Sequence, residues 1–307
     1  RKGTRMRIGV MLGGARRTPA LSEWVERTRD LEARGFDTLW LPGVFGFDPL
    51  VAAAVIGQAT HRIEIGTAVV PTYPRHPAAL AQQALTTAAA CGGRLTLGIG
   101  LSHPAVIENL LGLSYRRRAS HMLEYVQVLG PLLRGERVAF RGEEYRVELG
   151  LDIPGAPPVP LVIAALGERM LEIAGSHAQG TILWCTGPRA IERHIAPRLR
   201  AAARAAGRPA PRIVAGMHIA LTSKVELARQ KVAKAMKFYG QMPSYRAMLE
   251  REGADGLDRM ALVGDERALD ADLDRLRDLG VSDFEASILP VDDETEDLTL
   301  RYLESRL

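Results

Sequence analysis

The chain has 307 residues, and its 40 Lys and Arg against 36 Asp and Glu give a net charge of +4. Hydrophobic residues make up 47% and charged residues 25%, a globular balance that excludes a disordered or collagen-like chain. The length suits either two domains or one large α/β barrel.

The charge pattern and the composition exclude several kinds of partner. Arginine supplies 35 of the 40 basic residues, but these are scattered and form no tail that would bind nucleic acid. Aromatic residues are only 5%, too few for base-stacking surfaces. No run of about 18 apolar residues predicts a membrane span, and no signal-peptide core follows the first residues. With only 2 cysteines we expect a reducing, cytoplasmic location.

The first part of the chain alternates short apolar runs with helical patterns. Asp48 followed by Pro49 predicts the start of a helix, and Gly35 marks the end of the helix before it. The predicted strands are 7–12, 38–41, 63–70 and 95–100, and the predicted helices are 19–34, 48–58, 77–91, 104–110 and 115–133.

The pattern changes between 134 and 158 and then resumes. Residues 137–147 predict a hairpin around Arg141 and Gly142, and prolines crowd the residues that follow. The later predicted strands are 161–166, 181–186, 213–221 and 284–289, and the later helices are 168–177, 189–206, 223–239, 244–251, 265–279 and 294–306.

The order of these elements predicts the fold. Eight apolar strands, each followed by helix, indicate a parallel sheet covered on both faces. Their number and the chain length favour a closed (β/α)8 TIM barrel, an α/β fold, over an open doubly wound sheet. Residues 1–307 then form one domain, with 134–158 as an insertion between the fourth and fifth strands.

The site of such a barrel lies at the carboxyl ends of its strands. The residues that this rule selects are mostly small or apolar, and few carry charge. The sequence shows no metal-ligand cluster, no nucleophile elbow and no phosphate loop, so we expect no metal. A site of this kind suits a large planar cofactor that brings its own reactivity.

Four segments resemble one known family. GTAVVPTYPRHP (66–77) and GGRLTLGIGLSHP (92–104) resemble the luciferase-like monooxygenase superfamily of flavin and deazaflavin oxidoreductases, which share a (β/α)8 barrel. PLVIAALGERMLEIAGSHAQG (160–180) is similar to its fifth-strand segment, and GEEYRV (142–147) to its inserted hairpin. The first segment looks most like the branch that uses coenzyme F420, a deazaflavin, with FMN-dependent oxygenases as the close alternative.

The resemblance implies a cofactor site around three strand ends. Residues 67–69 would lie under the ring, with a non-prolyl cis bond at Ala68–Val69. Residues 165–167 would open a helix whose free N–H groups bind the phosphate that F420 and FMN share. A plain strand end, tight packing and a water-capped helix are the structural alternatives. The residues expected to bind the cofactor are Gly13, Thr67, Ala68, Val69, Gly100, Leu101, Ser102, Ala164, Ala165, Leu166, Gly167 and Trp184.

His103 is the candidate catalytic residue, a proton donor, because histidine titrates near neutrality. The family's sugar-phosphate branch has a carboxylate at about this position and an Asp-His pair where this chain has Gly43 and Val44, which argues against a sugar-phosphate substrate. Gly43, His76 and Trp184 are expected to line the substrate site. A surface or capping role is the alternative for both histidines, and a core position is the alternative for Trp184.

The resemblance implies an F420-dependent oxidoreductase that passes a hydride between the deazaflavin C5 and a small organic substrate. The alternatives are an FMN-dependent monooxygenase that uses reduced flavin and oxygen, and a non-catalytic flavin- or deazaflavin-binding protein. Many barrels of this superfamily dimerise, so a homodimer is one expectation, although no segment marks an interface. We expect neither nucleic acid nor a membrane as a partner.

Overall fold

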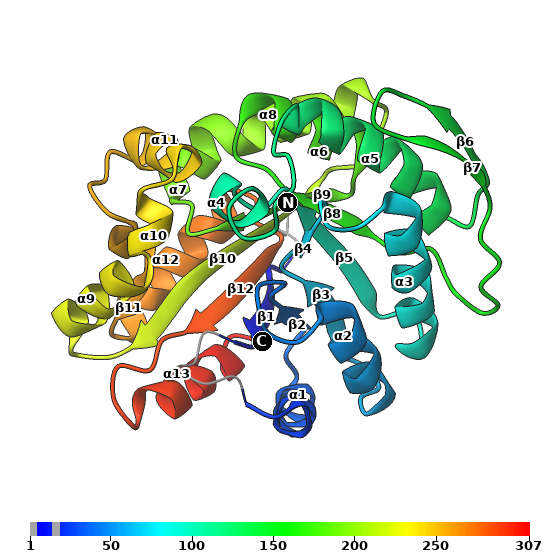
Figure 1. Ribbon diagram of the computed structural model, residues 1–307. Coiled ribbons are helices and arrows are strands. Elements are labelled where there is room, and N and C mark those ends of the chain that lie inside the picture. Colours follow the sequence, from blue (N-terminus) through cyan, green and yellow to red (C-terminus); the bar gives the residue numbers. More distant parts are fainter. Residues whose placement is uncertain (1–4, 14–18) are drawn as a thin grey trace.

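A closed ring of parallel strands forms the centre of the molecule in the computed structural model, which describes residues 5–13 and 19–307 (Figure 1). The ring runs β1–β2–β3–β5–β8–β9–β10–β12 and closes from β12 back to β1. This confirms the (β/α)8 TIM barrel that the sequence predicts. The barrel strands are β1 (Arg7–Met11), β2 (Thr38–Leu41), β3 (Glu64–Thr67), β5 (Leu95–Gly100), β8 (Leu161–Ala164), β9 (Gly180–Trp184), β10 (Arg212–Leu221) and β12 (Asp283–Ile288).

Helices surround the barrel (Figure 1). The helix ends predicted at Asp48 and Gly35 are confirmed. Asp48 accepts hydrogen bonds from the backbone N–H groups of Leu50 and Val51 at the start of one helix, and Gly35 ends the helix before it with a φ of 91°. The outer helices are α1 (Leu21–Arg34), α2 (Pro49–Gln58), α3 (Pro77–Ala90), α5 (Arg118–Leu133), α6 (Glu168–His177), α8 (Ala196–Ala205), α9 (Val225–Ala235), α11 (Pro243–Glu252), α12 (Glu266–Asp278) and α13 (Thr295–Glu304). Three short helices follow strand ends or join longer helices: α4 (Pro104–Ile107), α7 (Pro188–Ala190) and α10 (Lys237–Gly240).

Several predicted boundaries of helices and strands differ from those of the structure. The strand expected over 63–70 is interrupted after Thr67, and a separate short strand, β4 (Val70–Pro71), pairs with β5. The helix expected over 189–206 contains the π-helical turn η1 (Ile191–Ile195). The strand β11 (Leu262–Gly264) extends the sheet beside the end of β10, and its three residues are too few to give a periodic pattern. A 3-10 turn, η2 (Leu257–Met260), precedes it.

The predicted hairpin forms a two-stranded antiparallel sheet of its own, β6 (Val138–Arg141) and β7 (Arg146–Leu149). Glu124 of α5 anchors its turn, because its carboxylate accepts hydrogen bonds from the backbone N–H groups of Glu143, Glu144 and Tyr145 at 2.9, 2.9 and 3.2 Å. On this basis we propose that 134–158 is an insertion within a single domain.

A layer of paired charges closes the amino-terminal end of the barrel. Arg212 meets Asp283 at 2.7 Å and Glu64 at 3.1 Å, and Arg7 meets Glu64 at 2.9 Å. Above this layer Trp40 is fully buried, and Gly66 on the neighbouring strand leaves the space for its ring. The charged layer and Trp40 close the barrel interior from this end, so a ligand would enter the interior from the opposite end.

Candidate active site

The chain bends sharply between β3 and β4, at the carboxyl-terminal mouth of the barrel. The expected non-prolyl cis peptide bond is present at Ala68–Val69, and both residues are half-buried. Thr67 holds the bend against β5, since its hydroxyl donates to the Gly98 carbonyl and accepts from the Gly98 N–H, both at 2.8 Å. Side-chain hydrogen bonds therefore fix the start of this segment.

Three glycines surround this bend. A methyl group at Gly43 would collide with the Val69 carbonyl oxygen, and one at Gly98 would collide with the Thr67 carbonyl oxygen. A methyl group at Gly100 would lie 2.7 Å from Val69 Cγ2 and 3.2 Å from Ala164 Cβ. The bend is thus packed directly against bare backbone of β2 and β5, which holds residues 67–69 in place at the mouth.

The loop after β5 continues the rim of the mouth. Ser102 has a φ of 62°, and its carbonyl accepts a hydrogen bond from the Tyr115 hydroxyl at 2.8 Å. The His103 side chain makes no capping hydrogen bond to α4; its ring contacts Tyr239 and Tyr245, with centroids 5.7 and 6.3 Å away. Burial lowers the pKa of His103, so the imidazole is neutral at neutral pH.

The turn before α6 presents free backbone N–H groups. Gly167 is the N-cap residue. Among the described residues, no side chain caps the helix, and no atom beyond the chain neighbours lies within 4 Å of where a Gly167 methyl group would be. His194 of η1 fixes the turn from behind, with its Nε2 2.7 Å from the Leu166 carbonyl oxygen. An uncapped helix start of this kind is a general anion site.

Polar side chains inside the barrel lie beneath the mouth. Trp184 at the end of β9 packs edge-on against His218 of β10, with ring centroids 5.1 Å apart. Nδ1 of His218 lies 3.2 Å from the Ser287 hydroxyl, and Glu285 is fully buried one inward position below Ser287 on β12. Sequence reasoning placed His218 among the residues at the strand ends but gave it no role, and it missed Glu285. The available signal was the every-second-residue polar pattern of DFEASI in an otherwise apolar strand.

The match to known proteins covers most of the chain. The luciferase-like monooxygenase family matches residues 5–283. The chain belongs to this family.

Three similar proteins illustrate this match, and the two of them that are named as enzymes support an enzyme of the oxidoreductase class. An uncharacterized Mycobacterium tuberculosis protein is 28% identical over 267 residues, covering 79% of this chain and 77% of the relative. An F420-dependent glucose-6-phosphate dehydrogenase of Nakamurella multipartita is 35% identical over 160 residues, covering 50% of this chain and 47% of that protein. A coenzyme F420-dependent tetrahydromethanopterin reductase from Methanopyrus kandleri has a structure with a TM-score of 0.83 at 19% identity, covering 99% of both chains.

Within this family barrel, most of the predicted site residues gather at the mouth. Gly13 follows β1, has a φ of 116° and lies against Pro42. Trp184 is half-buried at the end of β9. The other predicted cofactor residues lie in the bend, at Gly100 beside it, in the loop after β5, and at the end of β8 with the turn before α6. Their contact with a cofactor stays a prediction.

His76 stands apart from this group. Its Nδ1 accepts the Ala78 N–H at 3.2 Å as the N-cap of α3, and its exposed ring contacts Tyr145 of the hairpin. These contacts match the capping alternative, so its place in the substrate site is a weaker prediction than that of Gly43 or Trp184.

A buried polar chain connects the bend with the hairpin, and sequence reasoning missed it. The Thr72 hydroxyl lies 3.1 Å from Nε2 of His121, and Nδ1 of His121 lies 2.8 Å from the Glu144 carboxylate. Tyr73 stacks on the His121 ring at 4.0 Å. Burial lowers the pKa of His121 although Glu144 opposes this, so the ring joins two secondary-structure elements as a neutral hydrogen-bonding group.

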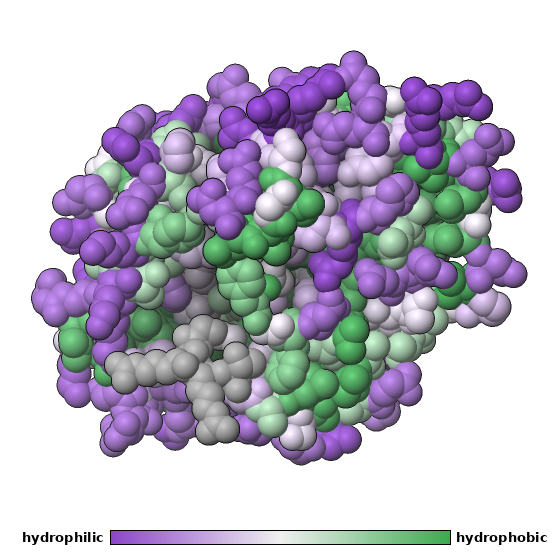
Figure 2. Space-filling view, viewed as in Figure 1, coloured by the Kyte–Doolittle hydropathy of each residue, from purple (hydrophilic) through white to green (hydrophobic). Residues whose placement is uncertain are grey.

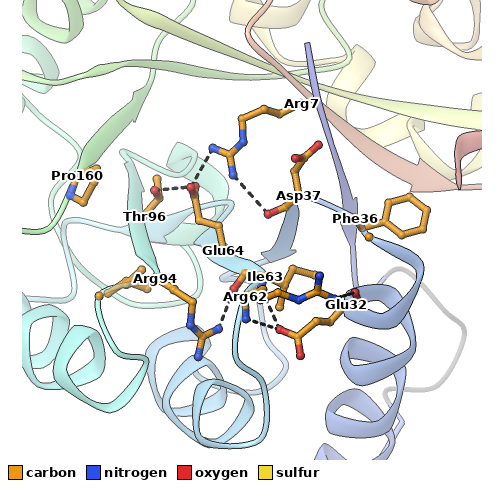
Figure 3. Close-up of a pocket in the computed structure, with 13 residues that line it drawn as sticks. Arg7, Glu32, Phe36, Asp37, Arg62, Ile63, Glu64, Arg94, Thr96 and Pro160 are labelled. Atoms are coloured by element: carbon orange, nitrogen blue, oxygen red, sulfur yellow. Dashed lines mark hydrogen bonds and ion pairs between the residues drawn. The ribbon is translucent and has the colours of Figure 1, made fainter. Parts of the chain in front are cut away.

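A pocket of about 430 Å³ lies at the opposite, amino-terminal end of the barrel (Figure 3). Its charged groups already have partners. Arg7 forms an ion pair with Glu64, and the Arg94 guanidinium donates to backbone carbonyls such as that of Ile63 at 2.8 Å. Glu32 accepts three backbone N–H groups from 61–63. Because these groups are already paired, we place the candidate site at the mouth.

The described residues hold no group of three or more His, Cys, Asp or Glu side chains that could bind a metal ion. Over the same residues, no helix is long and apolar enough to cross a membrane.

Proposed function

We propose that this protein is an F420-dependent oxidoreductase that transfers a hydride between the deazaflavin C5 and a small organic substrate. The observation that carries the proposal is the bend at residues 67–69, which three glycines allow to pack tightly against β2 and β5 and which would offer a flat ring a fixed support at the mouth. The F420-dependent dehydrogenase among the relatives supports F420 over other planar cofactors.

The residues at the mouth suit this cofactor. When bound, it would supply or accept the hydride. Val69 and Gly100 would support its ring, and the N–H groups after Gly167 would bind its phosphate. His103 would face the substrate as a neutral imidazole that donates or accepts a hydrogen bond.

Apolar side chains around the mouth indicate the kind of substrate. Val44 and Phe45 after β2, Leu110 after α4 and Phe238 of α10 are exposed by 50–69%. The space-filling view shows apolar side chains beside a hollow on this face (Figure 2). Such an exposed apolar rim favours an apolar organic substrate over a sugar phosphate.

An FMN-dependent monooxygenase is the second candidate, because the turn before α6 offers the same N–H groups to either phosphate. A non-catalytic binding protein is the third, since few charged side chains line the mouth. Titration of the purified protein with F420 and with FMN, followed by fluorescence, separates the first two. Tight FMN binding without quenching of F420 would refute our proposal.

Turnover separates the enzyme from a binder. We expect oxidation of reduced F420 by a panel of apolar carbonyl compounds and alkenes, or reduction of F420 by alcohols. His103→Ala should lower turnover while leaving F420 binding in place. An unchanged rate in His103→Ala would remove the role assigned to this residue.

We also propose a homodimer formed through α2 and α3. Neither helix contains a charged residue, and α2 exposes Val51 by 61% and Val55 by 43%. The other outer helices present charged faces; α1, for example, carries seven charged side chains in 14 residues. An uncharged face of this kind is self-complementary, so a second copy of the chain is its natural partner.

A further inference from the structure

Glu285 occupies an unusual position inside the barrel. The strand register places it between Gly9 of β1 and Gly216 of β10, so neither flanking strand has a side chain beside it. A methyl group at Gly216 would lie 2.6 Å from Glu285 Oε2 and 2.9 Å from the Trp184 ring. The rings of Trp184 and Trp40 enter the space that these two glycines leave beside the carboxyl group, since a methyl group at Gly9 would lie 2.8 Å from Trp40 Nε1.

The carboxyl group is buried without a partner. Glu285 is 2% exposed, and its Oε1 has no hydrogen-bond partner among the described residues. Leaving a buried polar atom unpaired costs free energy, so a stable fold retains one mainly where a ligand or water completes it.

His218 lies diagonally above Glu285 on the next strand. Gly216 is the register partner of Glu285, and His218 is the partner of Ser287, one inward position nearer the mouth. With Nδ1 occupied by the Ser287 hydroxyl, Nε2 of His218 is buried and has no partner among the described residues. Glu285 Oε1 and His218 Nε2, both without a partner among the described residues, therefore lie one above the other from the barrel interior toward its mouth.

The other charged groups nearby do not satisfy this pair. Asp283, Arg212 and Arg7 lie below Glu285 on the same three strands, and they pair with one another and with Glu64. The Cys185 thiol behind Trp184 is buried, and burial raises its pKa, so it is neutral. Burial raises the pKa of Glu285 to about 8 and lowers that of His218 to about 4, so both groups are uncharged at neutral pH.

We propose that Glu285 and His218 form the proton site of the reaction, on the floor of the mouth. The inference rests on the proposed hydride transfer, and it favours substrates that interconvert a carbonyl and an alcohol. His218 faces the substrate oxygen, and Glu285 below it is the proton store.

The step balances in both directions. In reduction, the carbonyl carbon receives a hydride from the reduced deazaflavin and the carbonyl π electrons move to oxygen. That oxygen takes a proton from His218 Nε2, the Ser287 hydroxyl returns a proton to Nδ1, and Glu285 replaces the hydroxyl proton and becomes a carboxylate. A bound reduced deazaflavin would supply the hydride and would itself be oxidised; the carbonyl becomes an alcohol, and solvent later reprotonates Glu285. Oxidation of an alcohol reverses each transfer.

Glu285→Gln tests this role because it preserves the shape of the side chain but cannot release a proton. We expect kcat to fall at least about tenfold and the pH dependence near pH 8 to disappear, with F420 affinity unchanged. Glu250→Gln, an exposed carboxylate on α11, is the matched control and should behave as the wild type.

A second readout needs no cofactor. Infrared spectroscopy of the purified protein should show the carbonyl band of a buried carboxylic acid at neutral pH, and this band should vanish in Glu285→Gln. If Glu285→Gln does not fold, His218→Gln takes its place and should lower kcat to a similar extent.

The outcomes separate the inference from the proposed function. Failure of the wild type to bind F420 overturns both. F420-dependent turnover in the wild type, with equal kcat and the same pH profile in Glu285→Gln, overturns the proton site alone. Absence of the carboxylic acid band also overturns it.

Discussion

Glycine at position 100 leaves the space that Val69 and Ala164 fill at the mouth of the barrel. Gly100→Ala should lower the free energy of unfolding by about 1–3 kcal/mol, because the added methyl group overpacks a closed site. The displaced bend should also weaken F420 binding by roughly tenfold, about 1.4 kcal/mol. Urea unfolding and a fluorescence titration measure the two effects.

Gly240→Ala is the control for that substitution, since no atom lies within 4 Å of its added methyl group. It should leave the F420 affinity unchanged and should not lower the free energy of unfolding. Wild-type F420 affinity in Gly100→Ala would show that the bend does not contact the cofactor.

Glu285 and His218 give the free energy of unfolding opposite dependences on pH. With its pKa raised by burial to about 8, Glu285 keeps a proton in the folded state that the unfolded chain releases above about pH 4.5. Its contribution is therefore present at low pH and is lost as the pH rises to about 8. With its pKa lowered by burial to about 4, His218 remains neutral while the unfolded chain binds a proton below about pH 6.5. This contribution is lost as the pH falls from about 6.5 to 4.

The two effects oppose each other below about pH 6.5, and above it Glu285 acts alone. We expect stability to fall by roughly 1 kcal/mol for each pH unit between about pH 6.5 and 8. Urea unfolding across this range measures the slope, and Glu285→Gln should flatten it. Parallel curves for the wild type and Glu285→Gln would contradict the prediction.

The start of α6 depends on a second element for its position. His194 of η1 holds the Leu166 carbonyl at 2.7 Å, which orients the turn whose N–H groups are proposed to bind phosphate. Loss of such a hydrogen bond costs about 1 kcal/mol, so His194→Ala should raise the Kd for F420 about fivefold. A fluorescence titration measures this change.

His177→Ala at the other end of α6 is the matched control and should leave the Kd unchanged. Equal affinity in both variants would mean that the turn before α6 does not bind the cofactor.

At the scale of helices and strands, sequence pattern predicted the elements that are long and locally determined. The eight barrel strands and the hairpin lie where apolar runs and turn residues predict them. The π-helical turn Ile191–Ile195 and the strand β11 escaped prediction, because packing and pairing with β10 define them rather than periodicity. The break after Thr67 was not predicted, and only the cis bond at Ala68–Val69 was expected, through the family resemblance.

For the molecule as a whole, the uncharged face of α2 and α3 carries the assembly prediction. Apolar side chains gather over the region of α2 in the space-filling view (Figure 2). Replacing Val51 and Val55 together by Glu places charge in the centre of the proposed interface, so the protein should sediment as a monomer while the wild type sediments as a dimer.

Leu227→Glu with Leu298→Glu is the control, because both leucines are exposed by 37–42% on other helices. This control variant should remain a dimer. A monomeric wild type, or a dimer that survives both glutamates in α2, would refute the interface.

The sequence by itself determined the barrel, the inserted hairpin and the family, because these depend on local patterns and on motifs contiguous in the chain. It also pointed to the bend at 67–69 and to the turn before α6. Only the tertiary structure brought Trp184, His218 and Glu285 together, since they come from strands separated by many residues and meet only when the barrel closes. A period of two shows that Glu285 shares a face with Asp283, but whether it finds a partner depends on which strands lie beside it. Here those strands offer glycine, so neither supplies a side chain that pairs with the carboxyl group.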